Sequence, residues 1–205
     1  QQSQGSAEGA ITSTNNNTSC IKMINNKKLL VLHGKKENYF TFHHIFAPNT
    51  SQKELYNNSA KKVIHEFVND NKNALIFAYG ISNSGKSYTM FGDKNNNNNG
   101  LIIQSINNIL QLLSKNQNNH YISLSFFEIY NEKLFDLLDI NNKIKIRETK
   151  EGYIFIENII EKKIKCKNQV NNLLLQIQEN QHIEQTKVND QSSRSHTIIR
   201  IKLYN

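Results

Sequence analysis

One stretch of this 205-residue sequence has the residue types and the spacing needed to hold a phosphate group. It fits the pattern G-x-x-x-x-G-K-[ST] and consists of Gly80, Ile81, Ser82, Asn83, Ser84, Gly85, Lys86 and Ser87. Its glycines let the backbone curl, so that successive N–H groups point inward at a β-phosphate. The Lys86 ammonium would lie against the β and γ oxygens, and the Ser87 hydroxyl would take one coordination position of Mg2+. The pattern predicts a nucleoside triphosphate with Mg2+, although a chance match in a Gly-Ser turn would look the same.

The elements around this segment are those that a phosphate loop needs. Residues 74–79 form a continuous apolar run, too short for a helix, which predicts a strand buried on both faces. Gly80 ends the run, and the polar segment after the loop is able to begin a helix. A strand, a glycine loop and a helix in this order favour the phosphate-binding interpretation over the chance match.

The rest of the chain alternates strand and helix patterns, which predicts a layered α/β class. Ser51, with Glu54 three residues later, has the pattern of a helix N-terminus. The predicted elements are a hairpin or a pair of edge strands over 28–33 and 39–46, helices over 51–69, 101–114 and 170–185, strands over 121–130 and 197–204, a turn over 134–138, and a hairpin over 143–147 and 153–156.

Composition narrows the class of protein without choosing a partner. The formal charge of +8 favours encounter with a polyanion such as nucleic acid, an anionic membrane or an acidic protein surface, but scattered lysines are equally typical of a solvated surface. Cys20 and Cys166 fit no metal spacing or disulfide framework, so we expect free thiols in a reducing compartment. No run approaches the roughly 18 apolar residues of a membrane span. We expect one domain over 21–205, an Asn-rich loop at 94–99, and a disordered or vector-derived segment at 1–20.

Three separate signatures resemble those of the kinesin motor-domain family. The stretch IFAYGISNSGKSYTMFGD (76–93) is similar to the kinesin phosphate loop, usually written IFAYGQTGSGKTYTMxG. SFFEIYNEKLFDLL (125–138) resembles S-x-x-E-I-Y-N-E-x-x-x-D-L-L, and NDQSSRSH (189–196) resembles the first nucleotide-sensing switch, N-x-x-S-S-R-S-H. They occur in the family's order, and the resemblance covers residues 39–204. It implies a P-loop NTPase with the three-layer α/β/α kinesin motor fold, here incomplete at both ends.

The resemblance also implies roles for matching residues. Lys86 and Ser87 would hold phosphate and Mg2+, and Tyr88 would lie beside the adenine of ATP or ADP. Ser193 would approach Mg2+, and Arg194 would pair with an acidic residue of a second switch. Asn189 and Ser192 would help to order the attacking water and the γ-phosphate. Taken without the phosphate loop, residues 192–196 would be more typical of a polar turn that caps a strand, with Arg194 in a surface ion pair.

Other polar residues suggest no second chemistry. Glu128 and Glu132 could suggest acid-base catalysis, but we expect packing and hydrogen bonding there, because phosphoryl transfer relies on positioning and electrostatics. The seven histidines form no apparent ligand set; His43 and His44, for example, would point to opposite faces of a strand.

The sequence departs from the family pattern at three positions. Asn83 stands at the middle glycine of the loop, which predicts either a stiffer loop or a left-handed residue there, a conformation that Asn tolerates. Gln104 and Gln181 stand where arginines are common. Both lack a charge that the family uses near the nucleotide or the switches, which argues against a normal rate of ATP hydrolysis. The 205 residues contain no R-x-R-P segment and no D-x-x-G-x-E second switch. We therefore expect this chain alone to lack full activity, and the 74–79 strand to lack neighbours that would satisfy its N–H and C=O groups.

The resemblance implies a microtubule-stimulated motor ATPase that couples hydrolysis to movement along microtubules or to their remodelling. The expected location is the cytoplasmic cytoskeleton, on microtubules or the spindle, with tubulin as partner and dimerisation through regions outside this chain. Arg147, Lys150, Lys162 and Lys163 could meet acidic tubulin, or be a solvated basic surface. The alternatives are a kinesin-like module that binds nucleotide or tubulin without hydrolysis and, less favoured by the signatures, a nucleic-acid ATPase.

Overall fold

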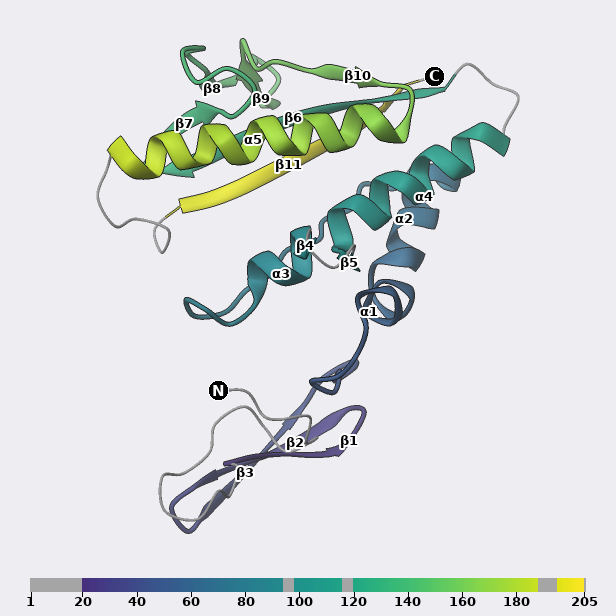
Figure 1. Ribbon diagram of the computed structural model, residues 1–205, viewed down its shortest axis with the longest axis vertical. Coiled ribbons are helices and arrows are strands. Elements are labelled where there is room, and N and C mark those ends of the chain that lie inside the picture. Colours follow the sequence, from purple (N-terminus) through teal and green to yellow (C-terminus); the bar gives the residue numbers. More distant parts are fainter. Residues whose placement is uncertain (1–19, 94–97, 116–119, 188–194, 205) are drawn as a thin grey trace. The chain divides into compact units, whose positions relative to one another are not determined.

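The computed structural model describes residues 20–93, 98–115, 120–187 and 195–204, with only the backbone of helix α5 at 178, 179 and 181–187. Contacts divide the chain into two compact units, residues 1–60 and residues 61–205 (Figure 1). Each unit is described by itself below.

The described part of the first unit begins with an antiparallel sheet of three strands. β1 (Ile21–Asn25), β2 (Lys28–His33) and β3 (Lys36–Thr41) lie in chain order, with β2 in the centre. The predicted first strand matches β2 in both bounds. The predicted second strand began and ended too late, since β3 ends at Thr41, and β1 was not predicted at all. Gly34, at φ 62°, supplies the positive dihedral that the tight turn between β2 and β3 needs.

The single helix predicted over 51–69 is wrong in one respect, because it is two helices. α1 (Gln52–Asn58) begins as predicted: the Ser51 hydroxyl accepts the Glu54 N–H at 3.2 Å. α1 ends at Ser59, whose backbone leaves the helical region at φ −123° and ψ −76°. The Ser59 hydroxyl donates back to the Leu55 carbonyl, and this local bond competes with continuation of the helix. α2 (Ala60–Asn69) then continues the apolar pattern.

The second unit is built on the long strand β6 (Tyr121–Tyr130), whose bounds match the prediction. β11 (Ser195–Tyr204) pairs antiparallel with the whole of β6, from Ser195 opposite Tyr130 to Tyr204 opposite Tyr121. The other edge of β6 is shared by β10 (Lys162–Ile164) and β7 (Lys133–Asp136). The turn predicted over 134–138 is therefore wrong in its first half, which is strand.

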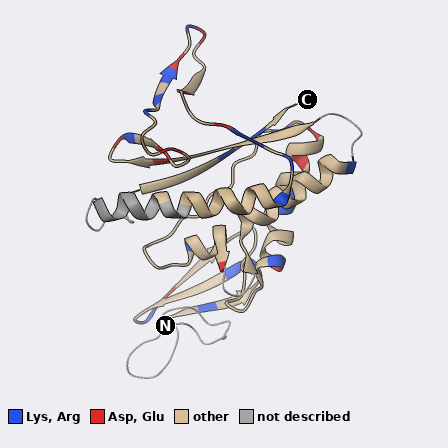
Figure 2. Ribbon diagram, turned by 45° about the horizontal axis from the view of Figure 1, so that its top comes forward, with Lys and Arg blue, Asp and Glu red and all other residues tan. Residues whose placement is uncertain are grey.

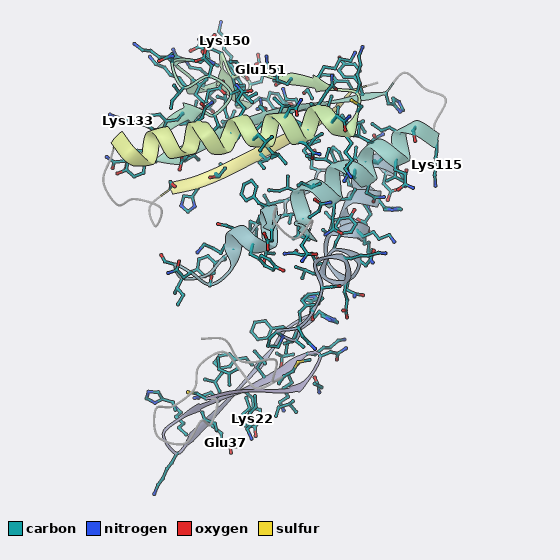
Figure 3. All side chains as sticks on the ribbon, in the orientation of Figure 1. Lys22, Glu37, Lys115, Lys133, Lys150 and Glu151 are labelled. Atoms are coloured by element: carbon teal, nitrogen blue, oxygen red, sulfur yellow. The ribbon has the colours of Figure 1, made fainter. Side chains whose placement is uncertain are left out.

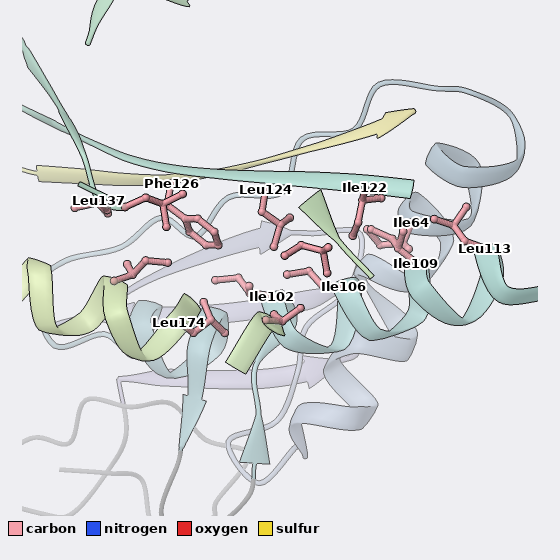
Figure 4. Packing of buried hydrophobic residues seen from close by; sticks show 14 of the residues in the cluster. Ile64, Ile102, Ile106, Ile109, Leu113, Ile122, Leu124, Phe126, Leu137 and Leu174 are labelled. Atoms are coloured by element: carbon pink, nitrogen blue, oxygen red, sulfur yellow. The ribbon is translucent and has the colours of Figure 1, made fainter. Parts of the chain in front are cut away.

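Helices cover one face of this sheet and form the core of the unit. Alternate β6 side chains, Ile122, Leu124 and Phe126, are fully buried and meet α2, α4 (Leu101–Lys115) and α5 (Lys167–Lys187) (Figure 4). The apolar residues of the helices recur at helical spacing, which is why the sequence predicted α4 and α5 to within a few residues. The helical members of the core include Ile64, Val68, Ile102, Ile106, Ile109, Leu113, Val170, Leu174 and Ile177.

The opposite face of the sheet carries a charged network centred on Glu161. Its carboxylate accepts hydrogen bonds from the Ser123 and Tyr204 hydroxyls, at 2.9 and 3.0 Å, and forms ion pairs with Arg200 and Lys202. Burial raises the pKa of the Glu161 carboxyl, but the bonds from Lys202, Ser123 and Tyr204 and the Lys202 charge lower it more, so the pKa lies below its usual range. The network joins β6, β11 and the chain before β10.

β8 (Lys145–Glu148) and β9 (Ile154–Glu157) form the separate hairpin that the sequence predicted. Lys150 and Glu151 lie at its turn (Figure 3). Arg147 donates to the Glu157 carboxylate at 2.9 Å in an exposed ion pair, so one of the four basic residues considered for an acidic partner is already paired.

Two glycines close the base of the Asn-rich insertion. β4 (Gly92–Asp93) pairs with β5 (Asn98–Asn99) immediately after α3 (Lys86–Phe91). A Cβ on Gly92 would lie 1.9 Å from the Asn98 oxygen, and a Cβ on Gly100 would lie 2.5 Å from the Met90 oxygen. The two backbones therefore approach as closely as only glycine permits.

The strand predicted over 74–79 is not formed. Residues 71–80 have no regular secondary structure, and no strand among the described residues pairs with them. Ile76 packs against the core, but the alternate side chains Leu75, Phe77, Tyr79 and Ile81 are 74–95% exposed. The apolar pattern indicates a segment suited to burial, but a strand also needs a neighbouring strand that accepts and donates its backbone hydrogen bonds.

Candidate functional site: the phosphate loop

The predicted phosphate loop is turned rather than extended. The Ser84 N–H donates to the Ile81 carbonyl at 3.3 Å, which closes a turn inside the loop. Asn83 has φ 62°, the left-handed conformation expected for this departure from glycine. Gly85 follows at φ 89° and is the N-cap of α3. The two positive φ values bend the chain around the loop, so the residue types determine its shape locally.

Gly80 and Gly85 are required for different reasons. A Cβ on Gly80 would lie 2.5 Å from the Ser84 hydroxyl oxygen and 3.3 Å from the Ser84 Cβ, so a side chain at Gly80 would force the Ser84 hydroxyl to rotate and crowd its Cβ. A Cβ on Gly85 would meet nothing within 4 Å, but the φ of 89° is strained for any residue with a Cβ. The first glycine thus supplies space, and the second supplies conformation.

The Lys86 side chain folds back over its own loop. Its ammonium donates to the Gly80 carbonyl at 2.9 Å and to the Ile81 carbonyl at 2.7 Å. Two uncharged carbonyls hold the cation at the mouth of the turn without neutralising it. The positive charge therefore remains available to an anion that approaches the loop.

Several backbone N–H groups of the loop are unpaired. Among the described residues, no protein acceptor receives the N–H of Ser82, Asn83, Gly85, Lys86 or Ser87. Lys86 is half-buried, whereas the other four residues are exposed. Unpaired backbone N–H donors beside an ammonium are groups that can bind phosphate oxygens.

Ser87 and Tyr88, the other predicted ligand-binding residues of this segment, lie in the first turn of α3. Both are exposed, Tyr88 by 51%, which leaves the Ser87 hydroxyl accessible to a metal ion and the tyrosine ring accessible to a base. Of the parts of the chain that the structure describes, none brings together three or more His, Cys, Asp or Glu side chains able to hold a metal ion. Within the described residues, Ser87 is the predicted Mg2+ ligand whose position the structure gives.

The predicted switch residues Asn189, Ser192, Ser193 and Arg194 lie outside the described residues. The elements on either side are described, since α5 ends at Lys187 and β11 begins at Ser195. The catalytic roles and the second metal ligand therefore stay predictions.

Gln104, which stands at an arginine position of the family pattern, has a local partner. Its side-chain amide donates to the Asn99 carbonyl at 2.8 Å. The residue therefore contacts the base of the Asn-rich insertion. The side chain of Gln181, at the other arginine position, lies outside the described set.

Sequence reasoning missed the structural centre of the second signature, Asp136. Its carboxylate is fully buried and accepts the N–H groups of Leu138 and Ile160 and the Asn142 side-chain amide, each at 2.9 Å. The only signal was its place before the leucine pair of the D-L-L text, because Ile160 is 24 residues away in sequence.

The two free cysteines, Cys20 and Cys166, are as predicted.

The glycine loop, its lysine and the helix after it define the class as a P-loop nucleotide-binding protein. A family model described as the kinesin motor domain matches residues 2–205. The chain therefore belongs to the kinesin motor-domain family. Its mixed helices and strands agree with the kinesin P-loop NTPase fold.

Individual relatives agree with this assignment. The chain is 34% identical over 200 residues to a kinesin heavy chain of Strongylocentrotus purpuratus, covering 94% of this chain and 19% of that protein. It is 31% identical over 197 residues to Kinesin-like protein KIF22-A of Xenopus laevis, covering 91% and 30%. A solved structure, titled "Structure of a fast kinesin: Implications for ATPase mechanism and interactions with microtubules", superposes with a TM-score of 0.83 at 25% identity, covering 90% of this chain and 53% of that one. The chain spans less than a third of the length of these two curated relatives.

None of the helices in the described ranges is long and apolar enough to cross a membrane.

Proposed function

We propose that this chain binds Mg-ATP and Mg-ADP through residues 80–87 and is part of a microtubule motor ATPase. The observation that carries the proposal is the turned loop, with unpaired N–H groups beside the Lys86 ammonium. Family membership supports ATP as the nucleotide and the microtubule as the track. Ser87 supplies the hydroxyl for Mg2+, and Tyr88 the ring beside the base.

Nucleotide binding is tested with Lys86→Ala. The lysine is expected to exchange its bonds to Gly80 and Ile81 for bonds to the β and γ oxygens. Loss of a charged hydrogen-bonding partner predicts about a tenfold to hundredfold weaker affinity for a fluorescent ADP analogue with Mg2+. Lys115→Ala removes the same charge from the exposed end of α4 and is the matched control (Figure 3). Equal affinities of the two variants, both folded by circular dichroism, would contradict the proposed site.

Motor activity is tested by phosphate release from ATP with and without microtubules, on a full-length motor domain, because these 205 residues contain no second-switch motif. The proposal predicts that polymerised tubulin accelerates release and that Lys86→Ala abolishes the acceleration. The proposed contact with acidic tubulin is the set of basic residues on and beside the β8–β9 hairpin (Figure 2). Of these, Lys150 is exposed, and the Lys163 ammonium lies 3.5 Å from the Tyr121 ring centroid. Acceleration by single-stranded DNA rather than by microtubules would favour a nucleic-acid ATPase. Acceleration of phosphate release by polymerised tubulin would also support the expected location on the microtubule cytoskeleton or spindle.

A second candidate function is a kinesin-like module that binds nucleotide or tubulin without hydrolysis. The observation that favours it is Gln104, which lacks the charge of arginine and whose amide is bonded to the Asn99 carbonyl. Tight ADP binding by the full-length motor domain with no measurable phosphate release, and no gain in release from Gln104→Arg, would select this function over the motor.

A further inference from the structure

The sequence contains one Asn-Gly pair, Asn99–Gly100, at the end of the Asn-rich insertion. The side-chain amide of an asparagine is open to attack by the backbone nitrogen of the residue that follows it. Glycine in that place makes the attack easiest, because no Cβ hinders the approach or restricts the backbone. Asn99 is half-buried in β5, and Gly100 is buried immediately before α4, so the structure gives the surroundings of both reacting groups.

The reaction open to this pair is deamidation, and its only co-reactant is water. The Gly100 nitrogen loses its proton and forms a bond to the Asn99 Cγ atom, and the side-chain nitrogen of Asn99 leaves as ammonia. Water then opens the resulting succinimide at one of its two carbonyls. Opening at Cγ gives aspartate, whereas opening at the backbone carbonyl gives isoaspartate, whose main chain runs through the side chain and is longer by a CH2 group. Both products carry a carboxylate in place of a neutral amide.

Hydrogen bonds at the base of the insertion oppose this reaction. The Gly100 N–H donates to the Phe91 carbonyl at 3.2 Å, so the nitrogen must give up this bond before it attacks. Ring closure also needs rotation of the peptide between Asn99 and Gly100, and the Asn99 carbonyl accepts the Gln104 side-chain amide at 2.8 Å. The Gln104 backbone N–H donates to the Gly100 carbonyl at 3.2 Å. Gln104 therefore holds the carbonyls on both sides of the reacting nitrogen.

The neighbouring backbone leaves little room for that rotation. A Cβ on Gly100 would lie 2.5 Å from the Gly92 nitrogen and from the Met90 oxygen, so backbone atoms already surround this position. The peptide can therefore turn only when β4 and β5 separate. Each of these strands has two residues, and so short a pairing opens locally at a low cost in free energy.

We propose that Asn99 is a site of spontaneous deamidation, that the separation of β4 from β5 sets its rate, and that Gln104 suppresses it. Isoaspartate adds a CH2 group to a backbone that already approaches its neighbour as closely as only glycine permits, so the closed base cannot form again. The closed base joins α3, which begins at Lys86, to α4. Conversion would thus loosen the junction that follows the phosphate loop. The proposal does not depend on nucleotide binding.

The test follows residue 99 while the intact chain is incubated in buffer at neutral and mildly alkaline pH. Peptide mapping by mass spectrometry gives the converted fraction, and a methyltransferase specific for isoaspartate labels that product. The same chain unfolded in guanidinium chloride gives the rate without the closed base. Gln104→Ala removes the amide donor, and Gln111→Ala, at an exposed position of the same helix, is the matched control. Circular dichroism shows whether each variant is folded.

Conversion in the folded chain is expected to be slower than in guanidinium chloride by about tenfold or more, because it waits for local opening. Gln104→Ala should accelerate it by about threefold to tenfold, the effect of one hydrogen bond, and Gln111→Ala should not change it. Absence of conversion in guanidinium chloride would overturn the site. Equal rates in the folded and unfolded chain, or equal rates in the two glutamine variants, would overturn the protection.

A second variant decides the matter if Gln104→Ala does not fold. A Cβ on Gly92 would lie 1.9 Å from the Asn98 oxygen, so Gly92→Ala opens the base without altering Gln104. Its rate should approach that in guanidinium chloride, and an unchanged rate would overturn the role of the closed base. The isoaspartate form, separated by ion exchange, should also melt at a lower temperature than Asn99→Asp, which has the added charge without the CH2 group. Equal melting temperatures would show that the base closes again, against the proposal.

Discussion

Asp136 provides the sharpest test of how the second unit is held together. Its buried carboxylate has no cationic partner among the described residues and is satisfied by three N–H donors. Two of these donors are the backbone groups of Leu138 and Ile160, and the third is the Asn142 side chain. Replacement by alanine would remove the acceptor of all three donors; the bond from Leu138 is buried, the other two are partly buried, and Asn142 keeps its bond to the Asn158 carbonyl.

The magnitude follows from these contacts. A buried donor left without its acceptor costs about 1–3 kcal/mol, and three donors lose their acceptor here, while alanine also removes the cost of burying the carboxylate. We expect Asp136→Ala to lower the free energy of unfolding by about 3–5 kcal/mol on that basis. Asp136→Asn keeps the shape but turns an NH2 group toward a donor, and we expect about 2–3 kcal/mol.

The measurement is urea unfolding followed by circular dichroism. The slope of the unfolding free energy against urea concentration should be the same in every variant, which shows that the unfolded state is unchanged. Asp139→Ala is the matched control, because Asp139 is exposed and accepts one N–H, that of Asn141, at 3.0 Å. The control should lose no more than about 1 kcal/mol. The reasoning is refuted if Asp136→Ala costs no more than this control.

Three further outcomes are expected. Gly100→Ala should destabilise the chain by about 1–3 kcal/mol, because its Cβ would lie 2.5 Å from backbone atoms of Met90 and Gly92, and a near-neutral change in a thermal melt would contradict this. Glu161→Gln should lower the free energy of unfolding at neutral pH, and the loss should shrink as the pH falls below 4.5, the ordinary pKa of the carboxyl. The reason is that the pKa of Glu161 is lowered in the folded state. The charged network is therefore complete above pH 4.5 and is lost as the folded carboxylate is protonated. Unfolding curves of both forms between pH 7 and pH 3 check this, and a difference independent of pH would count against it. Asn83→Gly should be nearly neutral, whereas Asn83→Val should cost about 1–2 kcal/mol, because a β-branched residue resists φ 62°; equal melting temperatures of the two variants would show that the loop does not need a left-handed residue.

Local patterns predicted those elements whose residues alone decide the conformation. β2 and β6 were predicted in both bounds, α4 was predicted to within one residue, and the left-handed Asn83 was anticipated from its residue type. In each case the signal is a short-range one: alternation along a strand, helical spacing of apolar residues, or the tolerance of one residue for positive φ.

The errors share a different cause. The helix predicted over 51–69 breaks at Ser59, where a side chain competes for a backbone carbonyl that the apolar spacing does not report. Residues 74–79 have the composition of a buried strand but no pairing partner among the described residues. Composition indicates whether a segment is suited to a buried strand, but the neighbouring strand and the side chains that bury it come from other parts of the chain.

The sequence by itself determined the phosphate loop and the family, because both are written in contiguous residues whose types carry the chemistry. Only the tertiary structure revealed that Lys86 folds onto its own carbonyls, that Asp136 holds three donors, and that two amides of α5 meet Leu137 and Leu138. The partners of Asn180 and Gln176 are 43 and 38 residues away, and no local spacing encodes a contact made at that separation. Such contacts depend on where the fold brings distant segments together, which is a property of the packed chain.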